Sequence, residues 1–514
     1  MRPINARRLF LTVALLGALA GPVCAAIPDS ENLVLQHLYA QANGANWIRK
    51  DNWLDGRGNE CNWYGVVCDS QQTHVTGIAL ATNQLVGTLP ADLADLTNLT
   101  TFHAESNQLT GPIPALTGWT NLRTFYVNNN QLNGPIPALT GLTNLEFFVV
   151  YSNQLSGPIP ALTGLTNLID FEVHSNQLNG PIPALAGLTN LEYFFAQSNH
   201  LAGPIPQLTG LPMLKTFHVG SNQLSGPIPA LAGLTNLGYF YAYDNQLNGP
   251  IPALTGLTKL TDFWVGFNRL NGPIPALAGL TNLESFRVGF NYLTGPIPAL
   301  TGLSNLQLFD ASVNGLNSPI PVLTGLPNLT NFYVHANQLT GQIPALTDLT
   351  SLVVLNVGHN LLTGFVPAPP SPSSLLPGGS TLCPNPFDLA SSPNDDFWNV
   401  ATGITPWWSA GLGQCDALVA YPQFLATAQD EPLSITLTAD GDALSYAIVA
   451  PPSQGGELTG TPPNVTYTPA PGFNGIEIFM FYATDGTADS NVAAVTITVG
   501  DVGDDRIFAD GFGD

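Results

Sequence analysis

The chain has 514 residues and a formal net charge of −23, with 35 acidic against 12 basic residues, which argues against nucleic acid as a partner. Only 9% of the residues are charged, but 45% are hydrophobic, so the chain is not one that lacks the material for a core. Glycine (51) and proline (44) are abundant, which predicts many short elements joined by tight turns.

Residues 1–25 predict a cleaved export signal. Three arginines precede a short apolar run at residues 9–20, and small residues follow at 25–26. A lipoprotein signal acylated at Cys24 is the alternative, but the bulky Val23 stands where such a signal needs a small residue. No later segment is long and apolar enough to span a membrane, so we expect a protein that is secreted or held at the cell surface.

Residues 26–74 are expected to form an N-terminal cap. Their first part, residues 30–44 (SENLVLQHLYAQANG), has the spacing of one amphipathic helix. The apolar side chains that this helix offers for burial are Leu33, Leu35, Leu38 and Tyr39. Because a stack of repeats needs its end covered, this helix predicts where the stack begins.

A period of 23 residues dominates the middle of the chain. An asparagine recurs from Asn83 to Asn360, first after 24 residues and then after every 23, which makes 13 turns. A period this short and strict predicts a solenoid whose turns contact only their neighbours. Strand alternation points one phenylalanine inward in each of eleven consecutive turns, from Phe102 to Phe332.

Two other fixed positions in each turn have clear physical roles. The recurring asparagine carries both donors and acceptors, so a stacked asparagine ladder is expected to satisfy backbone groups in the turns. The prolines of the GPIP motif remove backbone donors, and we expect them to keep the return path from forming a long regular sheet.

The repeats at residues 75–370 resemble the leucine-rich repeat family in its plant-type subclass. They match L-x-x-L-x-L-x-x-N-x-L-x-G-x-I-P, as in LEFFVVYSNQLSGPIP at residues 145–160. The resemblance implies a right-handed β/α superhelix with a parallel sheet on its concave face and short helical or extended segments outside. The cap also resembles the N-terminal cap of this family, C-x-W-x-G-V-x-C, from Cys61 to Cys68.

Four cysteines remain after the export signal, as two local pairs that flank the repeats: Cys61 with Cys68, and Cys383 with Cys415. In an oxidising compartment these pairs predict two disulfides. The other two pairings would require the ends of a long solenoid to meet. Zinc binding is a further alternative, but clustered ligands are lacking near both pairs.

The chain changes character after the repeats. Residues 371–429 are expected to form a C-terminal cap and linker, residues 430–500 an antiparallel β-sandwich, and residues 501–514 an acidic tail. The sandwich resembles bacterial immunoglobulin-like or cadherin-like modules in YTPAPGFNG, FYATDG and AAVTITV.

Some modules of this kind bind calcium. Oxygen ligands could come from Asp440, Asp442, Asp485 and Asp489, although solvated turn residues are the simpler interpretation. We expect no other metal and no cofactor.

Positions that barely change from turn to turn are expected to hold the fold together, whereas positions that vary are expected to form a surface. Four outward strand positions vary in each turn, and twelve of these 52 hold an aromatic residue, about a quarter against 9% in the whole chain. Such a face indicates an interaction site, and 13 strands at a spacing of ~4.8 Å make it roughly 60 Å long. The predicted binding residues are Tyr126, Tyr151, Asp170, Glu172, His174, Tyr193, Phe195, His218, Tyr239, Tyr241, Tyr243, Trp264, Phe267, Arg287, Phe290 and Tyr333.

We therefore expect an exported recognition protein without catalytic activity, which binds a protein or a polysaccharide at a cell surface through the concave face and uses the sandwich as a spacer. The alternative is a structural adhesin or surface spacer that acts through the sandwich, with or without calcium. An enzyme would require Asp170, Glu172 and His174 to converge on a closed pocket, but successive side chains on one strand face lie ~7 Å apart.

Overall fold

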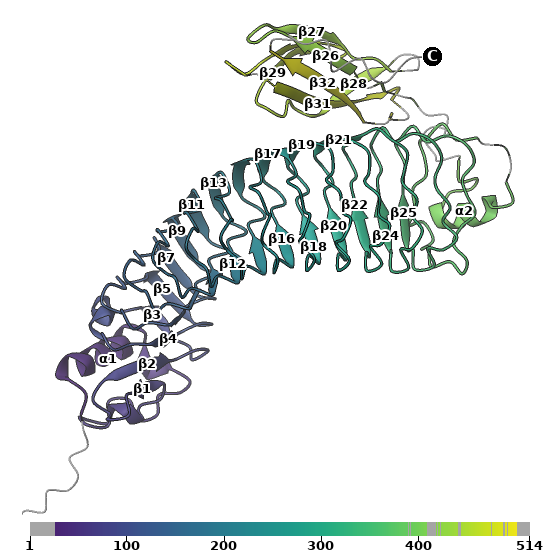
Figure 1. Cartoon of the computed structure of the whole chain (residues 1–514). Coiled ribbons are helices and arrows are strands. Elements are labelled where there is room, and N and C mark those ends of the chain that lie inside the picture. The colour runs from purple at the N-terminus through teal and green to yellow at the C-terminus, as the bar shows by residue number, and fades with distance from the viewer. Residues whose placement is uncertain are drawn as a thin grey trace, which may run out of the picture.

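The computed structural model describes residues 26–500, except 389, 391, 409–417, 419, 422, 440–443, 474, 487–488 and 491. The described residues form a curved solenoid with a smaller β domain against its flank (Figure 1). The expected export signal at residues 1–25 and the tail at residues 501–514 lie outside them. Within the described part, no helix combines the length and apolar character needed to cross a bilayer.

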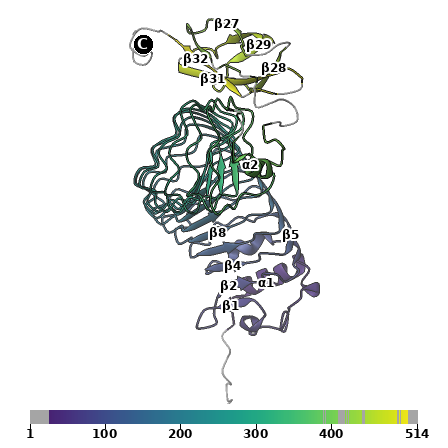
Figure 2. The same ribbon diagram turned by 90° about the vertical axis from the view of Figure 1, so that its right-hand side faces the viewer.

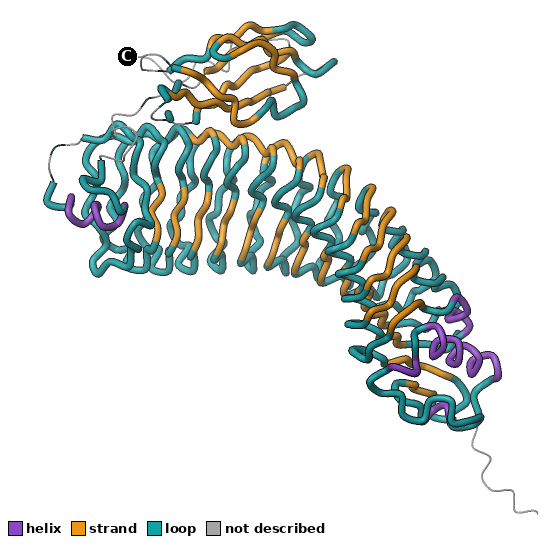
Figure 3. The backbone as a smooth tube through the Cα atoms, turned by 180° about the vertical axis from the view of Figure 1, so that it is seen from behind, coloured by secondary structure: helices purple, strands orange, loops and turns teal. Residues whose placement is uncertain are grey.

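One parallel strand per turn lines the inner side of the arc, which confirms the predicted solenoid (Figure 3). Equivalent residues pair across turns, so that Phe171 lies between Phe148 and Phe194. The antiparallel strand β1 (Val66–Cys68) from the cap precedes them. The parallel strands are β2 (Val75–Ala79), β4 (Thr101–His103), β6 (Thr124–Tyr126), β8 (Phe147–Val149), β10 (Asp170–Glu172), β12 (Tyr193–Phe195), β14 (Thr216–His218), β16 (Tyr239–Tyr241), β18 (Asp262–Trp264), β20 (Ser285–Arg287), β22 (Leu308–Asp310), β24 (Asn331–Tyr333) and β25 (Val354–Asn356).

A continuous column of phenylalanines forms the core beneath this sheet. The rings from Phe102 to Phe332 are fully buried, and neighbouring centroids lie 5.3–5.8 Å apart. Each such pair contributes about 0.5–1.5 kcal/mol beyond its buried area. The column therefore joins each turn to the next along most of the solenoid.

The predicted asparagine ladder is confirmed. In the turn of Asn199, the side-chain oxygen accepts the N–H of Leu178 at 2.9 Å, and the amide nitrogen donates to the carbonyl of Val173 at 3.1 Å. A second ladder, which we did not predict, runs along the outside: the amide of Asn190 donates to the carbonyl of Thr166 at 2.9 Å. Both ladders satisfy backbone groups in turns and at strand ends that the sheets leave unpaired.

The expectation that prolines prevent a sheet on the return path was wrong. Short strands that end in or just before GPIP pair in parallel as an 11-stranded second sheet, because only the prolines themselves lack a donor. Among the described residues 75–370, only η3 (Ala91–Asp95) is helical, so the outer segments are extended. The second sheet contains β3 (Val86–Thr88), β5 (Gln108–Pro112), β7 (Gln131–Gly134), β9 (Gln154–Pro158), β11 (Gln177–Gly180), β13 (His200–Gly203), β15 (Gln223–Gly226), β17 (Gln246–Pro250), β19 (Arg269–Gly272), β21 (Tyr292–Gly295) and β23 (Gly315–Leu316).

The N-terminal cap contains the predicted helix, α1 (Asp29–Gln41). Leu35 and Leu38 are buried as expected, but Leu33 is 49% exposed and Val34 is buried in its place, because the buried stripe runs one residue later. The 3₁₀ segments η1 (Gly44–Asn46) and η2 (Glu60–Asn62) follow α1.

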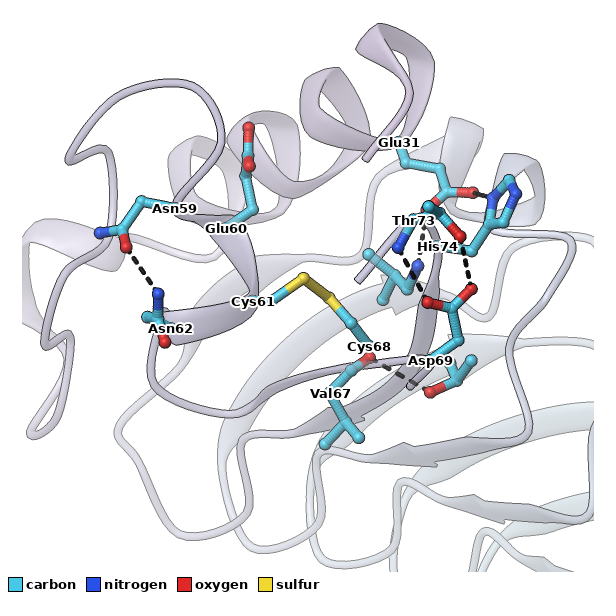
Figure 4. Close-up of a disulfide and its surroundings, with 12 residues drawn as sticks. Glu31, Asn59, Glu60, Cys61, Asn62, Val67, Cys68, Asp69, Thr73 and His74 are labelled. Carbon is cyan, nitrogen blue, oxygen red and sulfur yellow. Dashed lines mark hydrogen bonds and ion pairs between the residues drawn. A yellow bond between two sulfur atoms is a disulfide. The ribbon is translucent and has the colours of Figure 1, made fainter. Parts of the chain in front are cut away.

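The predicted Cys61–Cys68 disulfide is present, with the two Cα atoms 5.6 Å apart (Figure 4). It joins η2 to β1, the strand on which the concave sheet begins. Nearby, the buried Glu31 of α1 accepts hydrogen bonds from His74 at 2.8 Å and from the N–H of Val75 at 2.7 Å. These bonds fix the helix over the first turn.

At the other end of the solenoid, α2 (Asp395–Thr402) and the buried Trp398 and Trp407 cover the last turn. Cys415, the predicted disulfide partner of Cys383, lies outside the described residues. That pairing stays a prediction.

The C-terminal domain is a sandwich of a four-stranded and a three-stranded sheet. It begins before residue 430, at β26 (Gln423–Thr427), which pairs in parallel with β32 (Ala493–Val499). Within residues 430–500 the strands pair antiparallel, as predicted. Of the four suggested calcium ligands, Asp440 and Asp442 lie outside the described residues. Among the residues described, no group of three or more His, Cys, Asp or Glu could hold a metal ion. The strands are β26 (Gln423–Thr427), β27 (Leu433–Thr436), β28 (Ser445–Ala450), β29 (Glu457–Thr461), β30 (Asn464–Thr468), β31 (Gly475–Thr484) and β32 (Ala493–Val499).

Candidate functional site

The parallel register turns the variable outward residues into four columns along the concave sheet. Column 1 precedes the buried phenylalanine, column 2 follows it, and columns 3 and 4 are the two residues before the ladder asparagine. In the turn of Asn176 these positions hold Asp170, Glu172, His174 and Ser175. Side chains far apart in the sequence thus become neighbours at strand spacing.

The central turns bring together an aromatic patch, which we define as His218, Tyr241, Tyr243, Trp264 and Arg287. The rings of Tyr243 and Trp264 stack with centroids 3.8 Å apart. Arg287 lies over the indole at 4.9 Å, and His218 meets Tyr241 edge to face at 4.9 Å. The patch gathers aromatic rings around one cation, and all five of its residues belong to the predicted binding set.

Two further predicted residues, Phe267 and Phe290, stack in column 4 with centroids 4.4 Å apart. They are 51% and 42% exposed, although both are large and apolar. Both have positive φ values, 56° and 57°, a left-handed conformation that is uncommon for bulky residues. This pair, the phenylalanine ledge, lies at the corner between the concave sheet and the second sheet.

The other predicted residues lie in smaller groups along the face. Tyr151 stacks on His174 at 4.4 Å, and Lys215 lies 5.6 Å over the ring of Tyr193, which is 6.4 Å from Phe195. Tyr126 and Tyr333 stand apart from the central patch: Tyr126 packs against His103 in the early turns, and Tyr333 accepts a hydrogen bond from Asn331 in a late turn. Tyr239 borders the patch, with its ring centroid 6.2 Å from that of Tyr241.

Asp170, Glu172 and His174 approach one another on a single strand face. The carboxylate of Glu172 lies 3.7 Å from Nε2 of His174. Burial, together with repulsion from Glu172 and Glu192, raises the pKa of Asp170 to about 7. Farther along the face, burial and the proximity of His174 lower the pKa of His218 to about 4, so this imidazole is neutral at pH 7.

A hollow of about 380 Å³ opens beside the aromatic patch and is lined by Asp262, Ser285 and Arg287, among other residues. Sequence reasoning missed part of its wall, the residues immediately before column 1. Their identity varies from turn to turn, and that variation was the available signal. They are Thr261, Glu284, Gln307 and Thr330.

The concave face also holds most of the unpaired polar atoms. In the described part of the chain, twelve buried side-chain nitrogen or oxygen atoms lack a hydrogen-bond partner, and nine of them lie in columns 1–3. An unpaired buried polar atom costs about 1–3 kcal/mol, so the concave face is the part of the solenoid least optimised for stability. The nine belong to Glu105, Asp170, Gln197, His218, Asp262, Ser285, Arg287, His335 and Asn356.

Comparison with known proteins supports both parts of the fold. Residues 416–498 match a family model described as a bacterial Ig domain. The solenoid resembles the crystal structure of PEPR1–AtPEP1 (26% identity, TM-score 0.62, 70% of this chain and 52% of that chain). It also resembles the Arabidopsis receptor kinase HAESA in complex with the peptide hormone IDA and the co-receptor SERK1 (25% identity, TM-score 0.52, 70% and 66% of the two chains).

In sequence, 67 residues are 39% identical to the receptor-like kinase TMK2 of Arabidopsis thaliana. They make up 13% of this chain and 7% of that protein, so this chain matches only a small part of its curated relative. The solenoid is thus of the leucine-rich repeat type, and the C-terminal domain is immunoglobulin-like.

Proposed function

We propose that this protein is a non-catalytic recognition protein whose concave face binds an extended segment of a protein or peptide. The observation that carries the proposal is the gathering of aromatic rings and carboxylates in the outward columns of one face. The rings bind side chains of an extended segment, and the carboxylates pair with its basic groups.

The charge of the face favours a basic partner. Acidic side chains in columns 1–3 include Glu105, Asp170, Glu172, Asp262 and Asp310, and the aromatic patch supplies faces suited to Lys and Arg. A neutral polysaccharide could stack on the rings and donate hydroxyl hydrogen bonds to the carboxylates, but it would gain no attraction between opposite charges. The resemblance to HAESA, solved in complex with a peptide hormone, supports the same class of ligand.

The same reasoning extends to location and chemistry. The Cys61–Cys68 disulfide suits an oxidising compartment, so we place the protein outside the cytoplasm. Glu172 and His174 approach each other on the open face of the sheet, and the hollow beside the aromatic patch is lined by other residues. These two observations support recognition rather than catalysis.

The experiment is a binding measurement on an array of lysine-rich twelve-residue peptides. The triple variant Tyr241→Ala, Tyr243→Ala, Trp264→Ala should bind at least tenfold more weakly than the unmodified chain. The matched control is Ile48→Ala, Met213→Ala, Val322→Ala, which removes three exposed apolar side chains outside the four columns. Equal binding by the two triple variants would contradict the proposal.

A further inference from the structure

The immunoglobulin-like sandwich is seated on the flank of the solenoid rather than extended away from it (Figures 1 and 2). The hydroxyl of Tyr292 in β21 donates to the carbonyl of Pro451 at 2.7 Å, and Nδ1 of His359 donates to the carbonyl of Ser490 at 3.0 Å. Tyr292 is buried in one apolar cluster with Ile478, Met480 and Ala494 of the sandwich. The expected role of a spacer does not account for these contacts.

The repeats change where the sandwich lies on them. Residues 152–155, like the equivalent residues of three other earlier turns, read Ser-Asn-Gln-Leu, but residues 290–293 read Phe-Asn-Tyr-Leu and residues 313–316 read Val-Asn-Gly-Leu. The tyrosine makes the hydrogen bond to the sandwich. At Gly315, an added Cβ would lie only 3.5 Å from the Cβ of Ala494, so the missing side chain permits close approach.

The sandwich loop that meets Tyr292 is itself held rigidly. The fully buried carboxylate of Glu477 accepts hydrogen bonds from the hydroxyl of Ser453 at 2.8 Å and from the backbone N–H of Gln454 at 2.7 Å. This loop follows directly on Pro451. Charge-assisted bonds of this kind fix the loop, and with it the carbonyl that Tyr292 meets.

An apolar crevice of about 120 Å³ remains between the two domains. Phe290 and Val313 line it from the solenoid, and Val449, Ala450 and Met480 line it from the sandwich. Val449 lies where the pairing of β28 with β31 is interrupted by a bulge, and it is 45% exposed. A bulge re-aims a side chain in this way. The volume suits one aliphatic or small aromatic side chain, since an engineered cavity of about 150 Å³ holds benzene.

The crevice is continuous with the concave face through the phenylalanine ledge. Phe290 belongs to both, and it stacks on Phe267. Between the ledge and Trp264, column 3 holds Gly266 and Gly289; a Cβ at Gly266 would lie 3.3 Å from the indole nitrogen of Trp264, and one at Gly289 would lie 2.8 Å from the Asp310 carboxylate. The exposed ledge borders both this stretch of the concave face and the crevice.

We propose that the sandwich is part of the binding surface. Together with the tenth and eleventh turns, it forms a subsite that receives one apolar side chain of the basic peptide whose remaining residues lie on the concave face. The identity of the occupant rests on the proposed function. The position of the sandwich against the solenoid rests only on the contacts between the two domains.

The contact between the sandwich and the solenoid is tested first, without a ligand. In the full chain, the pair Gly315→Cys and Ala494→Cys should form a disulfide under mild oxidation, because the Cβ separation of 3.5 Å lies within the range of natural disulfides. Each single variant is a control and should keep one extra free thiol. If the double variant folds but retains two extra free thiols, the proposal is overturned.

The subsite is tested on lysine-rich twelve-residue peptides that differ at one position, which is Leu, Met, Phe, Ser or Asp. The unmodified chain should prefer the apolar residues at least tenfold. Val449→Asn should erase this preference and leave the binding of the serine peptide within twofold, whereas the control Val322→Asn should change neither.

A preference that persists in Val449→Asn would overturn the subsite. Trp264→Ala should instead weaken the binding of every peptide. Unchanged binding in that variant would contradict the proposed function of the concave face, so the two failures can be told apart.

Discussion

The ring of Tyr243 lies directly over Gly220 in the preceding turn, where an added Cβ would come within 2.7 Å of the ring. On its other side the same ring stacks on Trp264 at 3.8 Å. The aromatic patch therefore depends on a residue that has no side chain, because only glycine leaves space for the ring to lie flat.

This relationship predicts the effect of Gly220→Ala. The methyl group should displace the Tyr243 ring, separate it from Trp264 and weaken peptide binding several-fold, while the thermal midpoint changes by no more than about 4 °C. Binding assays and thermal unfolding measure both effects. Gly238→Ala is the matched control, since its Cβ would meet nothing closer than 3.7 Å. Equal binding by the two variants would contradict this account of the patch.

The asparagine ladders give a stability prediction. Asn199→Ala removes the amide that bonds to Leu178, Val173 and their neighbours in a buried turn, and should cost about 2–4 kcal/mol of unfolding free energy. Asn190→Ala removes an exposed bond of the outer ladder and should cost less than about 1 kcal/mol. Urea unfolding of both variants measures the loss of unfolding free energy in each. A comparable loss in the two would show that burial does not set the energy of the ladder.

The raised pKa of Asp170, about 7, predicts a pH-dependent stability. The proton held by the folded state stabilises it fully below about pH 4, the unfolded pKa, and this contribution is lost as pH rises through 7. Asp170→Asn should therefore gain about 1–2 kcal/mol relative to the unmodified chain between pH 4 and pH 8, allowing for solvent screening of a partly exposed group.

Denaturant titrations at pH 4, 6 and 8 measure this gain. The control is Asp51→Asn, at a carboxylate whose side chain is 63% exposed. A difference between Asp170→Asn and the unmodified chain that stays constant with pH would show that Asp170 carries no such proton.

The phenylalanine ledge predicts a conflict between stability and binding. Phe267 occupies a left-handed backbone position that Asn129 occupies in an earlier turn, and asparagine tolerates that conformation better than a bulky residue. Phe267→Asn should raise the unfolding free energy by about 1 kcal/mol and weaken the binding of peptides that reach the crevice. Calorimetry and the peptide array measure the two effects. A loss of stability would mean that the stacking on Phe290 outweighs the backbone strain.

The periodic part of the molecule could be predicted because each turn repeats one local solution. The inward phenylalanine and the ladder asparagine follow from strand alternation and from hydrogen-bonding capacity, and both were found where the period places them. The cap helix was also found, but the burial of Val34 instead of Leu33 was missed, because only tertiary contact sets the phase of a short helix.

The contacts between domains could not be predicted from periodicity. The seat of the sandwich joins residues more than 150 positions apart, such as Tyr292 and Pro451, and no local pattern links them. Its trace in the sequence is the replacement of Ser-Asn-Gln by Phe-Asn-Tyr and Val-Asn-Gly. These departures from the repeat are informative only once the structure shows what lies above them.

The uniform spacing of the phenylalanine column also bears on how such a chain can change over generations. Near-identical coding segments are prone to unequal recombination, and removing or adding 23 residues in the middle turns would rejoin two equivalent phenylalanines at the same stacking distance. The core would close without a defect, and the sandwich would remain on the last turns. A lineage can therefore lengthen or shorten the concave face in whole-turn steps while the phenylalanine ledge and its crevice are inherited intact.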